Sequence, residues 1–291
     1  CWQKRYLKNM KGKGKSLQEV PVVYRKQKFF HKRYSMAFFI GIDVGSGWTK
    51  AVVSKDNEIK SYAIVPSGGD YNKAARDACE IALKKIDIST KDIKYTVATG
   101  YGATMADFAQ DTASDISCHA KGISALFPHV RTVIDIGAQF TRAIRIDEDG
   151  RIINFIMNEK CAGGSGKFLQ VTARILRVDI EELGSLSLKS KNPVEFTTAC
   201  AVFAESEAIS RISEGARPED IVAGIHRAMA SKIITLAARV GMTPNYAITG
   251  GGAKDTGLVK ALENELKFKT FVPDEPQITA AFGAAILAGS R

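Results

Sequence analysis

Short apolar runs dominate the first half of the chain, and apolar residues at helical spacing dominate the second half. The first run, residues 37–44, ends at a glycine-rich turn and predicts a buried strand. Between residues 71 and 86, Ala75, Cys79 and Ala82 share one face of a predicted helix. Further strands are predicted at residues 51–54, 61–65, 95–99, 132–136, 141–146, 152–157 and 246–249. Further helices are predicted at residues 116–127, 164–177, 201–214, 218–240, 256–267 and 278–288. This mixture indicates an α/β protein.

One hairpin sequence occurs twice in the chain. Both copies read Asp, a β-branched residue, Gly, two small or polar residues, an aromatic residue, Thr and a basic residue, and each follows an apolar strand. The copies are Asp43-Val44-Gly45-Ser46-Gly47-Trp48-Thr49-Lys50 and Asp135-Ile136-Gly137-Ala138-Gln139-Phe140-Thr141-Arg142. We therefore expect two similar domains that offer one acidic hairpin each to a shared cleft. The predicted division is residues 36–128 with 275–291 against residues 129–274.

The repeated hairpins have the composition of a phosphate site. Glycine permits the backbone conformations and the close approach that let amide groups surround phosphate oxygens. Asp43 is predicted to hold Mg²⁺ through water, and Asp135 to orient the attacking water. The glycine triplet near the C-terminus is expected to lie against adenosine. The predicted nucleotide-binding residues are Gly45, Ser46, Gly47, Thr49, Lys50, Gly137, Gln139, Gly250, Gly251 and Gly252. The alternative for each aspartate is a structural cap of its turn.

Two cysteines precede predicted helices. Cys161 precedes a glycine-rich segment and the helix at 164–177, and Cys200 directly precedes the helix at 201–214. A helix N-terminus stabilises a thiolate and would equally favour an anionic cluster. Two thiolates do not complete a four-thiolate iron–sulfur site, but a two-fold dimer could supply the other two. The alternative is that both cysteines are small buried hydrophobic residues.

The net charge is concentrated at the N-terminus. Of the 41 Lys and Arg residues, 11 lie in residues 1–35 beside one acid, Glu19, so the net charge of +10 belongs to this leader. A nucleic-acid arm, a membrane tether and a transit peptide are open interpretations of such a segment. Because Met36 directly precedes the first strand, we interpret residues 1–35 as a disordered leader or as translated upstream sequence. For the remainder we expect neither a nucleic-acid partner nor a membrane.

The cysteine content points to a compartment. The chain has five cysteines, and we find no secretory apolar region and no apolar run of transmembrane length. Cysteines without secretory context indicate a reducing cytoplasm rather than disulfides. Cys79 is predicted to be core, and Cys118-His119 to have a structural role near the domain interface, because adjacent helical residues diverge too far to share a metal. Glu205 and Glu207 are left open between the nucleotide site and a solvated face.

The phosphate motifs resemble those of the actin, hexokinase and Hsp70 superfamily of ATPases. Their order matches: first phosphate hairpin, second phosphate hairpin, adenosine glycines and closing helix. The resemblance implies a two-domain α/β ATPase fold with duplicated phosphate-binding hairpins, which binds ATP or ADP with Mg²⁺. A Walker-type phosphate loop is absent, because Gly163-Gly164-Ser165-Gly166-Lys167 lacks its spacing.

Four segments resemble a narrower family, the ATPases of BadF/BadG/BcrA/BcrD type that activate 2-hydroxyacyl-CoA dehydratases or drive benzoyl-CoA reductases. These segments are residues 99–102, 115–122, 158–169 and 200–207. The resemblance implies that Cys161 and Cys200 bind a [4Fe–4S] cluster shared with a second ATPase subunit, which is either identical or homologous. It also implies ATP-driven transfer of low-potential electrons from a ferredoxin or flavodoxin to an acyl-CoA reductase or dehydratase.

The second hairpin departs from the family pattern. The activators usually carry Gly and then Gln-Asp-x-Lys at this point, whereas this chain has Ala138 followed by Gln139-Phe140-Thr141-Arg142. The missing acid places the chain closer to a benzoyl-CoA reductase ATPase subunit that works beside a non-identical sister. The alternative function is a small-molecule kinase of sugar type, or a regulatory ATP-binding module, with inert cysteines.

Overall fold

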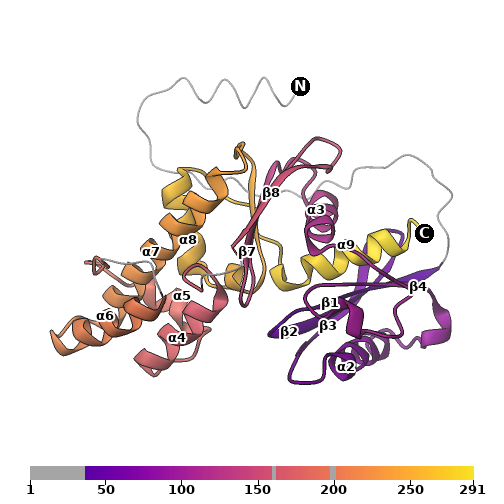
Figure 1. Ribbon diagram of the computed structural model, residues 1–291, viewed down its shortest axis with the longest axis horizontal. Coiled ribbons are helices and arrows are strands. Elements are labelled where there is room, and N and C mark those ends of the chain that lie inside the picture. Colours follow the sequence, from indigo (N-terminus) through magenta and orange to yellow (C-terminus); the bar gives the residue numbers. More distant parts are fainter. Residues whose placement is uncertain (1–36, 159–161, 197–200) are drawn as a thin grey trace. The chain divides into compact units, whose positions relative to one another are not determined.

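The computed structural model describes residues 37–158, 162–196 and 201–291. The predicted leader lies outside these residues. Contacts divide the chain at Tyr34, and the part from Ser35 onward forms one compact unit. The described residues of this unit form two separate β-sheets, each with helices packed on it (Figure 1).

The first sheet has five strands in the order β3-β2-β1-β4-β5. Its elements are β1 (Phe38–Val44), β2 (Trp48–Lys55), β3 (Glu58–Pro66), β4 (Ile93–Thr99), β5 (Asp111–Thr112) and the helix α2 (Tyr71–Lys84). β1 pairs antiparallel with β2 and parallel with β4. The Asp70 carboxylate caps α2 by accepting a hydrogen bond from the Lys73 amide. Small residues, including Ala75 and Ala78, let α2 pack closely on the sheet.

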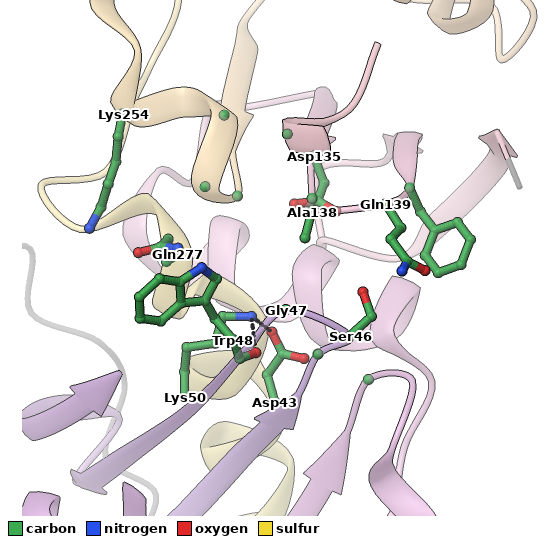
Figure 2. Close-up of a pocket in the computed structure, with 18 of the residues that line it drawn as sticks. Asp43, Ser46, Gly47, Trp48, Lys50, Asp135, Ala138, Gln139, Lys254 and Gln277 are labelled. Atoms are coloured by element: carbon green, nitrogen blue, oxygen red, sulfur yellow. Dashed lines mark hydrogen bonds and ion pairs between the residues drawn. The ribbon is translucent and has the colours of Figure 1, made fainter. Parts of the chain in front are cut away.

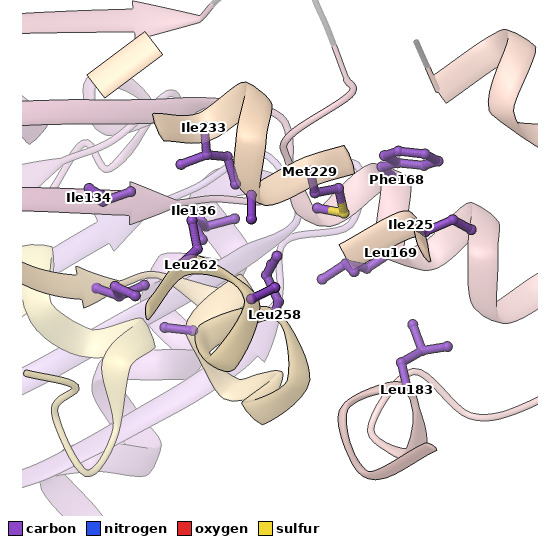
Figure 3. Packing of buried hydrophobic residues seen from close by; sticks show 14 of the residues in the cluster. Ile134, Ile136, Phe168, Leu169, Leu183, Ile225, Met229, Ile233, Leu258 and Leu262 are labelled. Atoms are coloured by element: carbon purple, nitrogen blue, oxygen red, sulfur yellow. The ribbon is translucent and has the colours of Figure 1, made fainter. Parts of the chain in front are cut away.

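The second sheet has four strands in the order β8-β7-β6-β9. Its strands are β6 (Thr132–Ile136), β7 (Thr141–Ile146), β8 (Ile152–Asn158) and β9 (Tyr246–Thr249), and its helices are α4 (Gly166–Leu176), α5 (Glu182–Ser187), α6 (Ala201–Ser213), α7 (Pro218–Ala238) and α8 (Thr256–Leu266). The core between sheet and helices joins Ile134 and Ile136 of β6 to Ile225 and Met229 of α7 and to Leu258 of α8 (Figure 3). This core fixes the direction in which the β6–β7 hairpin points.

Two helices exchange sheets. α3 (Asp115–Leu126) follows the first sheet but packs Ile116 and Ile123 on the second, beside Val133 and Ile144. α9 (Thr279–Ala288) follows the second sheet but packs on the first. The two helices also contact each other closely (Figure 1). The predicted grouping of residues 275–291 with the first domain stays a prediction, as does the boundary at residue 128.

The contact between α3 and α9 rests on two glycines. A Cβ atom at Gly122 would lie 2.2 Å from the Thr279 carbonyl oxygen, and one at Gly283 would lie 1.8 Å from the Cys118 carbonyl oxygen. We expect Gly283→Ala to lower the free energy of unfolding by about 1–3 kcal/mol, because the helices must move apart. Urea unfolding measures this. Gly69→Ala is the control, because no atom lies within 4 Å of its added Cβ. An unchanged midpoint in Gly283→Ala would contradict the close contact.

Each strand and helix predicted from the sequence is present, with boundaries that differ by a few residues. The largest shifts are in β2, which begins at Trp48 rather than at residue 51, and in β3, which begins at Glu58 rather than at residue 61. The sequence analysis missed the short β5 and α5. It also missed the 3₁₀ turns η2 (Thr90–Asp92), η3 (Ala103–Met105), η4 (Gly251–Lys254) and η5 (Pro276–Ile278). These short elements lack the periodicity that identifies longer ones.

Helix α7 corrects one sequence expectation. The helix is long and apolar enough to span a membrane by length and composition alone, although the sequence analysis expected no apolar run of that length. Half of its most apolar window is buried within the protein, where Ile225, Met229 and Ile233 belong to the core of the second sheet. A core helix passes the same test, so the composition of α7 has an explanation in packing.

Candidate functional site

A cavity of about 430 Å³ lies where the β1–β2 and β6–β7 hairpins face each other. Figure 2 shows Asp43 and Asp135 on opposite sides of it, with Ser46 and Gln139 toward one end and Lys254 and Gln277 toward the other. The turns after β4 and β9, the start of α3, the first half of α4 and the loop before α5 also line it. Each sheet therefore contributes its hairpin to one shared space.

The first hairpin places a charged pair in the cavity. Asp43 lies directly across from Lys50 in the β1–β2 register, and the Lys50 Nζ donates to Asp43 Oδ2 at 2.7 Å. The Gly45 amide donates to the Trp48 carbonyl and closes the turn. The hairpin register, rather than a chance contact, therefore fixes the pairing of carboxylate and amine.

The second hairpin repeats this arrangement. Asp135 lies across from Arg142, whose Nη1 donates to Asp135 Oδ2 at 2.7 Å, and the Gly137 amide donates to the Phe140 carbonyl. Arg142 also forms an ion pair with Asp115 at the start of α3. The repeat seen in the sequence is thus also a repeat in three dimensions.

His119 is the fourth group of this network, after Asp135, Arg142 and Asp115. Its Nε2 lies 3.5 Å from Asp135 Oδ2, and its side chain is 7% exposed. Burial alone would raise the pKa of Asp135, but the His119 ring and the Arg142 guanidinium outweigh it and hold that pKa below its usual value. Asp135 is therefore ionised at neutral pH. Its contribution to stability is present above the unfolded pKa and is lost as the pH falls through the lowered folded value.

A glycine turn lies beside each aspartate. Gly100 follows β4 and Gly250 follows β9, both with positive φ. A Cβ atom at Gly100 would lie 2.4 Å from Asp43 Oδ1, and one at Gly250 would lie 2.4 Å from Asp135 Oδ1. The duplication therefore extends beyond the hairpins. The turn Gly100-Tyr101-Gly102 lies beside Asp43 in the same way that the turn Gly250-Gly251-Gly252 lies beside Asp135.

The second hairpin is bonded to the segment that follows Cys161. The Gly137 carbonyl accepts from the Gly166 amide at 2.9 Å, and the Ala138 carbonyl accepts from the Lys167 amide at 2.8 Å. The Thr141 hydroxyl donates to the Gly164 carbonyl at 2.6 Å. The first turn of α4 is thus fixed directly to the hairpin that lines the cavity.

The cavity contains all but one of the predicted nucleotide-site residues. Those that line it are Asp43, Gly45, Ser46, Gly47, Lys50, Asp135, Gly137, Gln139, Gly250, Gly251 and Gly252. Thr49 is fully buried beside it, and its hydroxyl lies 2.9 Å from the Ser67 hydroxyl. The roles predicted for these residues stay predictions.

The cysteines divide into two groups. Cys1, Cys161 and Cys200 lie outside the residues that the structure describes. Cys79 and Cys118 are free and buried, and burial raises the pKa of each thiol to about 12. The core prediction for Cys79 is therefore confirmed, and Cys118 lies in the core beside α9. Neither is a reactive thiol.

The acidic pair left open by the sequence lies away from the cavity lining. Glu205 is 3.9 Å from Arg174 of α4, and Glu207 is 3.6 Å from Arg211 on its own helix. Sequence reasoning missed His119, Asp115 and Arg142 as members of the site. The signal available was the start of α3, where Asp115 and His119 lie one helical turn apart.

Two sheets with exchanged helices and a cavity between duplicated acidic hairpins define a two-domain α/β ATPase fold of actin/hexokinase type. The structure of a ROK family glucokinase from Streptomyces griseus in complex with glucose and AMPPNP matches with a TM-score of 0.57 over 88% of this chain and all of that one, at 12% identity. This match shows the fold alone. Residues 40–288 match the BadF/BadG/BcrA/BcrD ATPase family, and the chain belongs to that family.

Relatives of known name agree with this assignment. A 2-hydroxyisocaproyl-CoA dehydratase activator from Clostridioides difficile is 42% identical over 86% of this chain and 94% of its own. The structure of the activator of the 2-hydroxyisocaproyl-CoA dehydratase from Clostridium difficile with bound ADPNP matches with a TM-score of 0.83 at 41% identity, over 87% of this chain and 94% of that one. A subunit of benzoyl-CoA reductase from Thauera aromatica is 34% identical over 88% of this chain and 94% of its own. The predicted family and fold are confirmed, and the protein is an ATPase component.

Proposed function

We propose that this protein hydrolyses ATP in the cavity and uses the hydrolysis to drive one-electron transfer to an acyl-CoA dehydratase or reductase. The observation that carries the proposal is the set of hydrogen bonds that joins the second hairpin to the first turn of α4. Those bonds connect a phosphate-binding element with the segment that follows Cys161. A change at the phosphates therefore has a short path to the cysteine segment.

The nucleotide fits the cavity with its phosphates between the hairpins. The amides of Ser46 and Gly47 in the first turn, and of Ala138 and Gln139 in the second, would surround the phosphate oxygens, and Asp43 would hold Mg²⁺ through water. Asp135, held by Arg142 and His119, would orient the attacking water. Adenosine would lie against Gly250-Gly251-Gly252, where the absence of side chains leaves the backbone open.

The described residues fit a cluster held by Cys161 and Cys200. The turn that follows Cys161 is ordered, because the Ala162 carbonyl accepts from the amides of Gly164 and Ser165. α6, which begins directly after Cys200, packs on α4. The two cysteines thus precede neighbouring helices, and two subunits would supply the four thiolates of a [4Fe–4S] cluster. When bound, such a cluster supplies a one-electron carrier between a donor and an acceptor.

The partners follow from the same proposal. A reduced ferredoxin or flavodoxin would supply the electron, and the catalytic subunits of an acyl-CoA dehydratase or reductase would accept it, in the cytoplasm. Identity is 42% to the dehydratase activator and 34% to the benzoyl-CoA reductase component, which favours a dehydratase as acceptor over the benzoyl-CoA reductase that the second hairpin suggested. Ala138 and Phe140 leave the second hairpin without the acid that the activators usually carry, so the second subunit is either identical or a homologous sister.

Thr141→Val tests the link between hydrolysis and electron transfer. The variant removes the bond to Gly164 while keeping the shape of the side chain, a loss of about 1 kcal/mol. We expect ATP hydrolysis within about threefold of native and a yield of reduced acceptor per ATP that is about fivefold lower. The measurement compares phosphate release with reduction of the acceptor in anaerobic protein.

Thr172→Val is the matched control. Its hydroxyl also donates to a buried carbonyl at 2.9 Å, but that carbonyl belongs to Phe168 of the same helix, α4. We expect its yield per ATP to be unchanged. An equal loss in both variants, or none in Thr141→Val, would contradict the proposed path.

A further inference from the structure

His226 lies in the middle of α7 and contacts two other helices. Its side chain is 2% exposed. Nδ1 lies 3.0 Å from the Ser187 hydroxyl at the end of α5, and Nε2 lies 3.0 Å from Asp255 Oδ2 at the start of α8. One imidazole thus joins three elements of the second domain.

The ring has no room to move. A Cβ atom at Gly257 would lie 2.0 Å from the Ser187 hydroxyl and 2.9 Å from His226 Nδ1, so the first turn of α8 presses on both groups. A Cβ atom at Gly184 would lie 2.9 Å from Asp255 Oδ1. Glycines at these two positions permit α5 and α8 to approach the imidazole from both sides.

The two oxygens of Asp255 have different partners. Asp255 Oδ1 caps α8 by accepting from the Leu258 amide at 2.9 Å, which leaves Oδ2 for His226. Within the described residues, neither Oδ2 nor His226 Nε2 has an aligned hydrogen-bond partner, so the 3.0 Å approach between them is a close polar contact rather than an aligned hydrogen bond. A buried carboxylate oxygen without this contact would be costly.

Both helices that His226 joins to α7 begin at the cavity. Asp255 lines it, directly after the Gly250–Gly252 turn and Lys254. Ile180 and Glu181, directly before α5, line the facing wall. The phosphate hairpins belong to other strands and do not contact His226. The groups that His226 holds therefore border the cavity beside the Gly250–Gly252 turn, where the proposed function places the nucleoside.

We infer that His226 is a positioning residue for nucleoside recognition, which acts by holding the Asp255 carboxylate and thereby the wall formed by residues 250–255. The inference rests on the proposed nucleotide site and goes beyond it by assigning a group that the nucleotide does not touch. Loss of the Asp255 contact loosens the wall against the base and ribose, while the triphosphate keeps its own ligands. Binding that is lost equally in ground and transition state raises KM and leaves kcat unchanged.

Two substitutions separate the contacts of the imidazole. Gln places an amide near the position of Nε2 and keeps the Asp255 contact, whereas Asn places its amide near Nδ1 and keeps only the Ser187 contact. For His226→Asn in the full chain we expect an ATP KM about tenfold higher, kcat within about twofold, and a reduced preference for ATP over CTP in kcat/KM. For His226→Gln we expect values within about threefold of native.

The base preference separates positioning from a general loss of structure. ATP and CTP share the triphosphate, so a purely structural defect would lower kcat/KM for both equally. Thr132→Val provides a stability control. Thr132 is the first residue of β6, and the variant removes the hydrogen bond from its hydroxyl to the Thr243 carbonyl. We expect it to lower the unfolding midpoint without changing the preference for ATP.

Three results would overturn the inference. They are a native KM and base preference in His226→Asn, a fall in kcat at constant KM, and an equal loss in the Asn and Gln variants. If the unsubstituted protein does not hydrolyse ATP, both the proposed nucleotide site and this inference are overturned. Failure of electron transfer alone would overturn only the coupling, because these measurements need neither cluster nor acceptor.

Discussion

Replacing Asp43 or Asp135 with asparagine is expected to lower Mg²⁺-dependent ATP hydrolysis by at least about 100-fold. Asn keeps the shape of each side chain and removes its charge. Asp43 would lose its attraction for Mg²⁺, and Asp135 would lose the orienting charge that Arg142 and His119 hold in place. Phosphate release in the presence of Mg²⁺ measures the effect.

Asp135→Asn is also expected to lower the free energy of unfolding. In this variant the Arg142 guanidinium keeps only one carboxylate partner, Asp115, and lies in a largely buried site with less compensating charge. Asp111→Asn is the control, because its partner Arg291 is more than half exposed and the pair lies outside the cavity lining. Unchanged turnover in both Asp43→Asn and Asp135→Asn would show that hydrolysis takes place elsewhere.

Replacing Cys161 or Cys200 with serine is expected to abolish the iron–sulfur absorbance near about 400 nm in anaerobically purified protein. Each replacement removes one thiolate per subunit, and therefore two of four if a dimer shares the cluster. ATP binding is expected to be retained within about threefold, because the predicted nucleotide-binding residues belong to other segments of the chain. Iron and sulfide analysis together with nucleotide binding checks both parts.

Cys79→Ala supplies the matched control for the cysteines. Its thiol is buried on α2 with a pKa raised to about 12, so it is expected to be neither ligand nor nucleophile. We expect Cys79→Ala to keep its iron. Normal iron content in both Cys161→Ser and Cys200→Ser would rule out these cysteines as ligands.

Local sequence patterns were sufficient to predict the long strands and helices and the two hairpins of the site. The apolar runs and the helical spacing predicted the long strands and helices because burial repeats every second residue in a strand and every three to four in a helix. The repeated hairpin predicted where Asp43 and Asp135 stand, because a hairpin pairs residues that are close in sequence. The three consecutive glycines Gly250-Gly251-Gly252 are a local pattern too, and they predicted the turn after β9.

The remaining site residues depend on contacts between distant segments. His119 and Asp115 reach Asp135 and Arg142 only because α3 leaves the first sheet and packs on the second. The sequence predicted only that Cys118-His119 lie near the domain interface, since nothing local records which sheet a helix will cover. Thr49 lies beside the cavity rather than in its lining, because the pleat of β2 turns its side chain inward toward Ser67, and its predicted role in nucleotide binding stays a prediction.

The sequence by itself determined the α/β class, the order of the phosphate motifs and the family, because these depend on residue type and spacing along the chain. Only the tertiary structure decided that the second hairpin is bonded to the first turn of α4 and that His226 joins α5 to α8. Both arrangements bring together residues that are more than 20 positions apart. Packing of whole helices and sheets, rather than any local preference, sets such distances.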